Sequence, residues 1–163
     1  MRIDCLKLKQ NIVFAVTAIT VLFFDQLAKY FVIQNIPLYE SVEVLPNFFY
    51  LTHIKNAGAA FGIFQGMINI FIIISIFAVV LIIILRTLIE INSYPYNMSL
   101  GFILGGALGN LVDRLIMGEV TDFLHILFWP VFNIADSFIV IGFILLILIL
   151  LKNFSKKEKE RKD

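Results

Sequence analysis

The residues most capable of chemistry are acids and amides beside membrane-length hydrophobic sequence between Gly101 and Ser137. Asp122 and Asp136 stand out, because they are fourteen residues apart and flank a short connection that can bring two helix ends together. Charged side chains in such a setting are costly and point to a functional site. We expect Asp122 and Asp136 to form a catalytic pair at a membrane surface.

Two carboxyl groups that share a site cannot both ionise comfortably, so one keeps a proton while the other acts as a base. Such a pair can activate water against an amide carbonyl and then protonate the leaving nitrogen. We therefore expect neither a metal nor a cofactor. Desolvation near the membrane is expected to raise the apparent pKa of the shared proton, which suits acid–base work near neutral pH.

Other polar residues accompany this pair in the same stretch. Asp113 and Arg114 are consecutive and cannot point the same way on a helix, and we interpret both as structural or orienting groups. Arg114 can reach a carboxylate, a backbone carbonyl or a lipid phosphate. Asn110 and Asn133 can each donate to a carboxylate or to a substrate carbonyl.

Asp25 and Lys29 lie in an earlier apolar run. They are four residues apart, so they share one helix face and can pair. The pair either anchors a helix end at the interface or faces a substrate, and the sequence leaves both interpretations open.

Competing chemistries have little support. The chain contains no Gly-x-Ser-x-Gly and no His-Glu-x-x-His pattern. Asp122 and His125 have a spacing that a metal could use, but no second histidine follows nearby, so we expect no metal site. His53 is expected to be a surface histidine rather than a ligand.

The composition indicates a membrane protein. Of 163 residues, 60% are hydrophobic and only 15% charged, and the mean hydropathy is +0.94. No long basic stripe lies outside the C-terminal tail, which argues against a nucleic-acid partner.

The hydrophobic runs predict an all-α integral membrane protein. It has four transmembrane helices and a small extramembrane β-sheet between the first two helices, in a single domain over residues 1–163. The sheet is expected from two runs, Ser41–Leu45 and Phe48–Ile54, while the stripe Gly101, Gly105 and Gly109 predicts close helix packing. The expected elements are helix 1 over 11–33, strands within 35–66, helix 2 over 67–86, helix 3 over 98–117, helix 4 over 131–151 and a basic tail over 152–163.

Basic residues set the expected orientation. Ten of the thirteen Lys and Arg residues lie in the two terminal segments and the loop between helices 2 and 3. By the positive-inside rule both termini are cytoplasmic. The strands and residues 113–136 then lie at the outer face.

Five motifs in this order resemble the lipoprotein signal peptidases, also called signal peptidase II or prolipoprotein signal peptidases. The resemblance covers nearly the whole chain. Its motifs are Asp25-Gln26-x-x-Lys29, Asn56-x-Gly58-Ala59-Ala60, Gly105 to Arg114, Asp122-Phe123 and Phe132-Asn133-x-Ala135-Asp136.

The resemblance implies an aspartic peptidase in the bacterial cytoplasmic (inner) membrane, with its site at the outer face. It implies cleavage of prolipoproteins before a diacylglyceryl-modified cysteine, and Asp122 and Asp136 match the family's catalytic pair. Positions that bind substrate or support the site are matched by Asp25, Lys29, Asn56, Gly58, Asn110, Asp113, Arg114, Asn133 and Ala135. The implied partners are the prolipoprotein, membrane lipid and globomycin-like inhibitors, and we expect a monomer.

The resemblance also implies a short helix, besides the sheet, within residues 35–66, and Gly58–Ala60 with the sheet are expected to clamp the substrate. The chain departs from the family at Thr121, where an aliphatic residue is usual, and in a rather short connection from Asp122 to Asn133. Neither departure removes a catalytic group.

A different class of function also fits the residue types. In a small transporter or ion-relay protein, intramembrane carboxylates pass protons or cations. That hypothesis predicts carboxylates spread across the membrane depth, whereas here they are expected at one face. A scaffold with interface anchors is a third reading, but it leaves the Asn-x-x-Asp pattern of Asn110–Asp113 and Asn133–Asp136 unexplained.

Overall fold

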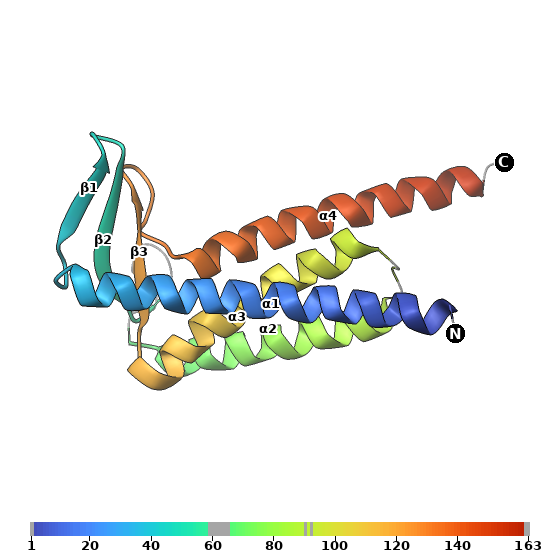
Figure 1. Cartoon of the computed structure of the whole chain (residues 1–163), viewed down its shortest axis with the longest axis horizontal. Coiled ribbons are helices and arrows are strands. Elements are labelled where there is room, and N and C mark those ends of the chain that lie inside the picture. The colour runs from blue at the N-terminus through green and yellow to red at the C-terminus, as the bar shows by residue number, and fades with distance from the viewer. Residues whose placement is uncertain (1, 59–65, 90, 92, 162–163) are drawn as a thin grey trace.

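The computed structural model describes residues 2–58, 66–89, 91 and 93–161. In this part of the chain, four long helices bundle together and a three-stranded sheet covers one end (Figure 1). Each helix has a segment long and apolar enough to cross a membrane, which confirms the predicted fold class. The elements are α1 (Arg2–Asn35), β1 (Ser41–Leu45), β2 (Phe49–Asn56), α2 (Ile68–Leu88), α3 (Tyr94–Met117), β3 (Val120–Ile126) and α4 (Ile134–Glu160).

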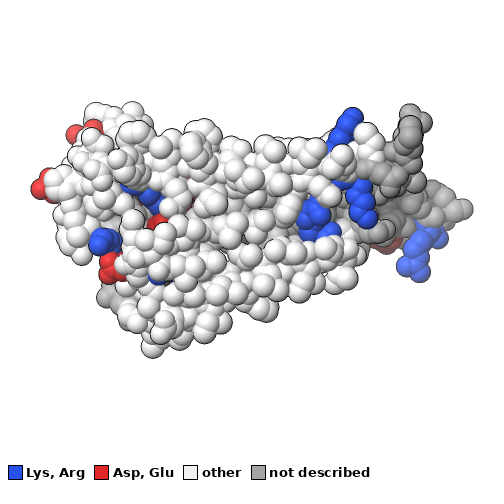
Figure 2. Space-filling model, turned by 60° about the horizontal axis from the view of Figure 1, so that its bottom comes forward, with Lys and Arg blue, Asp and Glu red and all other residues white. Residues whose placement is uncertain are grey.

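Helix α3 is the centre of the bundle and packs against α1, α2 and α4. In its most apolar window 56% of the residues are buried, against 17% or less in the other three helices. The outer helices therefore expose most of their apolar side chains, as helices facing lipid do. In Figure 2 the charged side chains gather toward the two ends, and the middle of that face is uncharged.

The glycines on α3 allow α1 to approach closely. A Cβ atom added to Gly105 would lie 2.5 Å from the carbonyl oxygen of Ala18, and one added to Gly101 would lie 2.9 Å from that of Phe14. Gly109 faces the carboxylate of Asp25 in the same way. These contacts confirm the predicted packing stripe.

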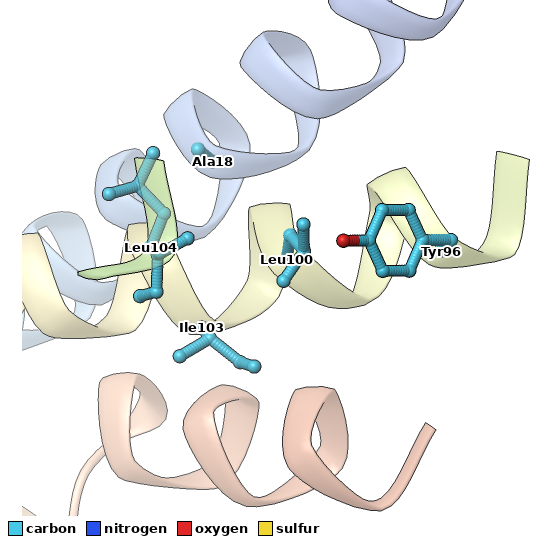
Figure 3. Packing of buried hydrophobic residues seen from close by; sticks show 6 residues of the cluster. Ala18, Tyr96, Leu100, Ile103 and Leu104 are labelled. Carbon is cyan, nitrogen blue, oxygen red and sulfur yellow. The ribbon is translucent and has the colours of Figure 1, made fainter. Parts of the chain in front are cut away.

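A hydrophobic cluster, which Figure 3 shows from close by, packs around the first half of α3. Tyr96, Leu100 and Ile103 of α3 are each at most 3% exposed, and Ala18 of α1 packs against the same helix. This core lies away from most of the charged residues singled out in the sequence, so the bundle has an apolar half and a polar half.

The helix bounds differ from those predicted. Helix α4 begins at Ile134 rather than near 131, because Asn133 is its N-cap and is extended, and α2 ends at Leu88 rather than 86. Helix α1 begins at Arg2 rather than near residue 11, α3 begins at Tyr94 rather than 98, and α4 continues to Glu160 rather than ending near 151. Lys, Arg and Glu are good helix formers, so the charged ends of α1 and α4 continue these two helices where no Pro or Gly stops them. Pro95 lies at the first positions of α3, where a missing N–H costs nothing.

Strands β1 and β2 confirm the two predicted strands, and β3 is a strand that the hydrophobic-run analysis missed. The three are antiparallel in the order β1-β2-β3, so the sheet joins the α1–α2 connection to the α3–α4 connection. The β-branched and aromatic residues of Val120–Ile126 were the available signal. Gly118, with φ of 77°, ends α3 in the left-handed conformation that lets the chain turn into β3.

Some expectations fall outside the described residues. Ala59 and Ala60 of the expected clamp belong to residues 59–65, which the structure does not describe. The short helix expected within 35–66 does not occur among the described residues of that range.

Replacing Gly105 with Val is expected to destabilise the protein by about 2 kcal/mol or more, because the new side chain must push α1 away from α3. Thermal unfolding in detergent measures the change. Ile116→Val is the control, since Ile116 lies on the same helix and is 75% exposed. Equal unfolding temperatures for the two variants would contradict the packing described.

Candidate active site

A buried ammonium group joins α1 to α3. Lys29 Nζ lies 2.8 Å from Asp25 Oδ2 and 2.9 Å from Asp113 Oδ2, and it donates to Asn110 Oδ1 at 3.2 Å. Lys29 and both acids are at most 3% exposed. The predicted Asp25–Lys29 pair is therefore present. Buried charges persist only when paired and hydrogen-bonded, and each of these has several partners.

Asp113 also holds the start of β3. Its Oδ2 accepts the backbone N–H of Thr121 at 3.1 Å, and its Oδ1 accepts Gln26 Nε2 at 2.8 Å. Thr121 immediately precedes Asp122. The orienting role predicted for Asp113 corresponds to these contacts, in which one carboxylate of α3 binds groups of α1 and of β3.

Asp25 holds the start of α4. Its Oδ1 accepts the backbone N–H of Ala135 at 2.8 Å. That N–H belongs to the first turn of α4, where backbone donors lack helical partners and favour negative charge. Ala135 is fully buried, and a Cβ on Gly109 would lie 2.6 Å from Asp25 Oδ2. Small residues are therefore needed around this carboxylate.

Asn133 connects the two candidate catalytic carboxylates. Its Nδ2 donates to Asp122 Oδ1 at 2.7 Å, while its backbone N–H donates to Asp136 Oδ2 at 3.3 Å. The side-chain oxygen of Asn133 accepts the backbone N–H of Asp136 at 2.9 Å, which completes a capping box at the start of α4. The structure thus brings Asp122 and Asp136 together around one asparagine.

Two further amides complete the network. Asn56 Nδ2 donates to Asp122 Oδ2 at 2.8 Å, and Asn110 Nδ2 donates to Asp136 Oδ1 at 2.7 Å. Asn110 Oδ1 accepts from both Asn133 and Lys29. Each carboxylate oxygen of the pair therefore has an N–H donor, and the pair is linked to Lys29 through Asn110.

The sheet register places Asn56 beside Asp122. Residue Ile54 of β2 pairs with Asp122, and Asn56 pairs with Val120, so Asn56 and Asp122 are diagonal neighbours. Asn56 also accepts the backbone N–H of Gly58 at 3.0 Å, which fixes its side chain. Gly58 therefore lies next to Asn56, the residue that donates to Asp122.

Burial raises the pKa of Asp122 from the ordinary carboxyl value to about 7, and the nearby charge of Asp136 adds to the rise. Hydrogen bonds from Asn56 and Asn133 and the charge of Lys29 act in the opposite direction. Asp122 is 2% exposed, so the loss of hydration dominates. A carboxyl group with this pKa can exchange a proton near neutral pH.

Arg114 points away from Asp113 and toward α2, as their consecutive positions predict. Its Nη1 donates to Ser75 Oγ at 3.2 Å, and its guanidinium carbon lies 5.3 Å from the ring centre of Phe71. Its charge also interacts with those of Asp113, Asp122 and Asp136. Among the described residues, Arg114 donates no hydrogen bond to a carboxylate or to a backbone carbonyl, which were two of the partners predicted for it.

The sequence interpretation was wrong about His53. This histidine is 5% exposed, and its Nδ1–H donates to the carbonyl oxygen of Ile36 at 2.8 Å. Burial follows because β2 packs against the end of α1. Gln26 and Ser75 were also not predicted as site residues. Both are polar residues within an apolar helix, and Gln26 also stands in the first of the five motifs.

Comparison with known proteins supports an assignment. The family model described as "Signal peptidase (SPase) II" matches residues 17–152. That range contains every residue of the network. This chain belongs to the signal peptidase II family.

Curated relatives agree with this family. The chain is 41% identical over 133 residues to a lipoprotein signal peptidase of Moorella thermoacetica, covering 82% of this chain and 89% of the relative. It is 42% identical over 154 residues to a lipoprotein signal peptidase of Staphylococcus aureus, covering 89% of this chain and 92% of the relative. A solved bacterial membrane enzyme superposes with a TM-score of 0.79 at 37% identity, covering 87% of this chain and 89% of the other. The chain is thus a multi-pass bacterial membrane protein of this family.

Replacing Lys29 with Met is expected to cost about 3–5 kcal/mol of unfolding free energy, because Asp25 and Asp113 lose their buried counter-charge. Thermal or denaturant unfolding in detergent measures the loss. Adding Asp113→Asn should cost less than the sum of the single effects, since the two residues are in contact.

Lys55→Met is the matched control for this change. Lys55 is an exposed lysine 3.8 Å from Glu119, and the loss of such a pair costs about 0–1 kcal/mol. If Lys29→Met were as mild as this control, the buried ammonium group would not stabilise the bundle.

Proposed function

We propose that this protein is an aspartic endopeptidase that removes the signal peptide from prolipoproteins by cutting before a diacylglyceryl-modified cysteine. Membership of the signal peptidase II family supports the peptidase class, and the names of the curated relatives support a lipoprotein substrate. Asp122 and Asp136 carry out the hydrolysis.

The observation that carries this proposal is the position of Asn133 between the two carboxyl groups, one held by its amide and the other by its backbone N–H. Together with the pKa of about 7 for Asp122, this arrangement favours a pair that retains one proton near neutral pH.

The reaction then needs no covalent intermediate. The ionised carboxylate takes a proton from water, and the resulting hydroxide attacks the carbonyl carbon of the scissile amide. The protonated carboxyl group supplies a proton to the departing nitrogen as the C–N bond breaks. The pair again holds one proton after the products leave.

The location of the site fits a substrate that is itself a membrane helix. The network lies where α1, α3 and α4 meet the sheet, at the end of the bundle opposite the two termini (Figure 1). The positive-inside pattern supports an orientation with this end at the outer face of the cytoplasmic membrane. A lipidated cysteine at that depth keeps its acyl chains in hydrocarbon while its amide reaches water. Globomycin-like peptides are expected to compete at this site, and the enzyme is expected to act as a monomer.

Asp122→Asn and Asp136→Asn are each expected to lower cleavage of a diacylglyceryl-modified prolipoprotein at least about 10³-fold, because either change removes one half of the acid–base pair. The measurement uses purified protein in detergent, and mass spectrometry locates the cut. A chelator should leave the native rate unchanged.

Glu119→Gln serves as the control, since Glu119 is an exposed acid just before β3 and pairs only weakly with Lys55. It should retain native activity. Normal cleavage by either Asn variant, with folding intact, would contradict the aspartic mechanism. If the native protein failed to cut the lipid-modified substrate, the proposed substrate would be wrong as well.

The activity should fall as pH rises through about 7, because the pair then loses the proton that it must donate. It should also fall at low pH, where both carboxyl groups are protonated and no base remains. Measured kcat/KM should therefore follow a bell-shaped curve.

Asn56→Ala should move the falling limb of this curve to higher pH, because the Asn56 amide stabilises the ionised form of Asp122. Asn35→Ala is the control, since Asn35 is exposed and bonds only within α1. A falling limb that stays in place in Asn56→Ala would show that Asp122 does not govern it.

A further inference from the structure

The turn after β1 and the loop after β3 form one exposed apolar surface, which we call the aromatic tip. Its members are Phe48, Leu127, Phe128 and Trp129, which are 49%, 52%, 80% and 63% exposed. The backbone N–H of Leu127 donates to the carbonyl oxygen of Phe48 at 3.3 Å, so the two segments are held together. Trp129 N–H donates to Ile126 at 2.8 Å, which closes the second turn.

The aromatic tip lies beside the membrane-spanning helices rather than above them. Figure 1 shows the sheet extending sideways past the start of α4, with the loop between β3 and α4 on the side of the sheet nearer the helices. The loop that carries Leu127, Phe128 and Trp129 is therefore displaced sideways from the helices.

Aromatic residues on α1 lie near the same end of the bundle. Tyr30 and Phe31 directly follow Lys29 of the buried network, and they are 59% and 56% exposed. Their rings meet edge to face at 5.9 Å. Tyr and Trp concentrate at the membrane–water interface, where an apolar ring and a polar group are both accommodated. The end of α1 that packs against the sheet thus also carries exposed aromatic side chains.

We propose that the aromatic tip is an interfacial anchor that inserts into the lipid headgroup region of the membrane that the helices span. Its partner is the bilayer itself. Exposed apolar side chains grouped in this way mark an interaction site on a protein surface. The loop that carries Leu127, Phe128 and Trp129 leads directly into α4, whose apolar side chains are exposed, and this continuity with a lipid-facing helix favours lipid over a soluble protein.

The anchor has a consequence for the candidate active site. The sheet carries Asp122 and Asn56, whereas Asp136 lies on α4. Fixing the outer end of the sheet to the membrane limits its rocking relative to the helices. This inference concerns the sheet and does not depend on the reaction proposed above.

The test uses the single tryptophan of the chain as a probe. The protein in nanodiscs should emit at shorter wavelength than a tryptophan in water, and it should lose emission when the acyl chains carry bromine. Dissolved iodide should quench it weakly. Tyr39→Trp in a Trp129→Phe background is the control, since Tyr39 is 72% exposed on the turn after α1, and its emission should respond mainly to iodide.

Two outcomes would overturn the proposal. Strong iodide quenching of Trp129 with no effect of brominated lipid would mean that the tip lies in water. Shielding from both quenchers that is lost as the protein is diluted to one copy per nanodisc would mean that a second copy covers the tip. Phe128→Trp with Trp129→Phe provides a second probe at the same surface, and it should repeat the bromine quenching.

Discussion

The structure depends on the neutralisation of one buried ammonium group. Lys29 is almost inaccessible, and a lysine in that position is tolerated only because Asp25 and Asp113 contact it and Asn110 accepts a hydrogen bond from it. Each partner also contacts another element: Asp25 accepts the backbone N–H of Ala135 of α4, Asp113 accepts that of Thr121 of β3, and Asn110 accepts a hydrogen bond from Asn133. The charge balance of one side chain thereby sets the relative positions of α1, α3, α4 and β3.

The side-chain amides of the asparagines likewise join separate elements, around Asp122 and Asp136. Asn133 caps α4 and at the same time contacts both candidate catalytic groups, so the start of that helix and the candidate pair share their hydrogen bonds. An amide can both donate and accept hydrogen bonds without changing its own protonation, so it can hold the proposed catalytic carboxyl groups in either of their protonation states. The glycines and alanines of α3 and α4 leave the space in which this network fits.

The helices and the main site residues were predictable from sequence because both follow local rules. Apolar runs predict membrane helices, and Asp25 with Lys29 is a four-residue spacing that defines one face. Strand β3 was missed because its short run lies between polar residues singled out for chemistry, and only its pairing with β2 makes it a strand. The burial of His53 and the bonds of Gln26 and Ser75 were equally out of reach, since each depends on residues distant in the chain.

The register between β2 and β3 makes the site sensitive to chain length. Side chains alternate between the two faces of a strand, so a shift of one residue turns an entire strand over. Thr121 is tied to Asp113 and Gly118 sets the turn, so the few residues between α3 and Asp122 have no slack. A single inserted residue there would point Asp122 away from Asn133 while leaving every side chain of the network in the sequence. The number of residues in this turn therefore matters as much to the geometry around Asp122 as the identity of the acids.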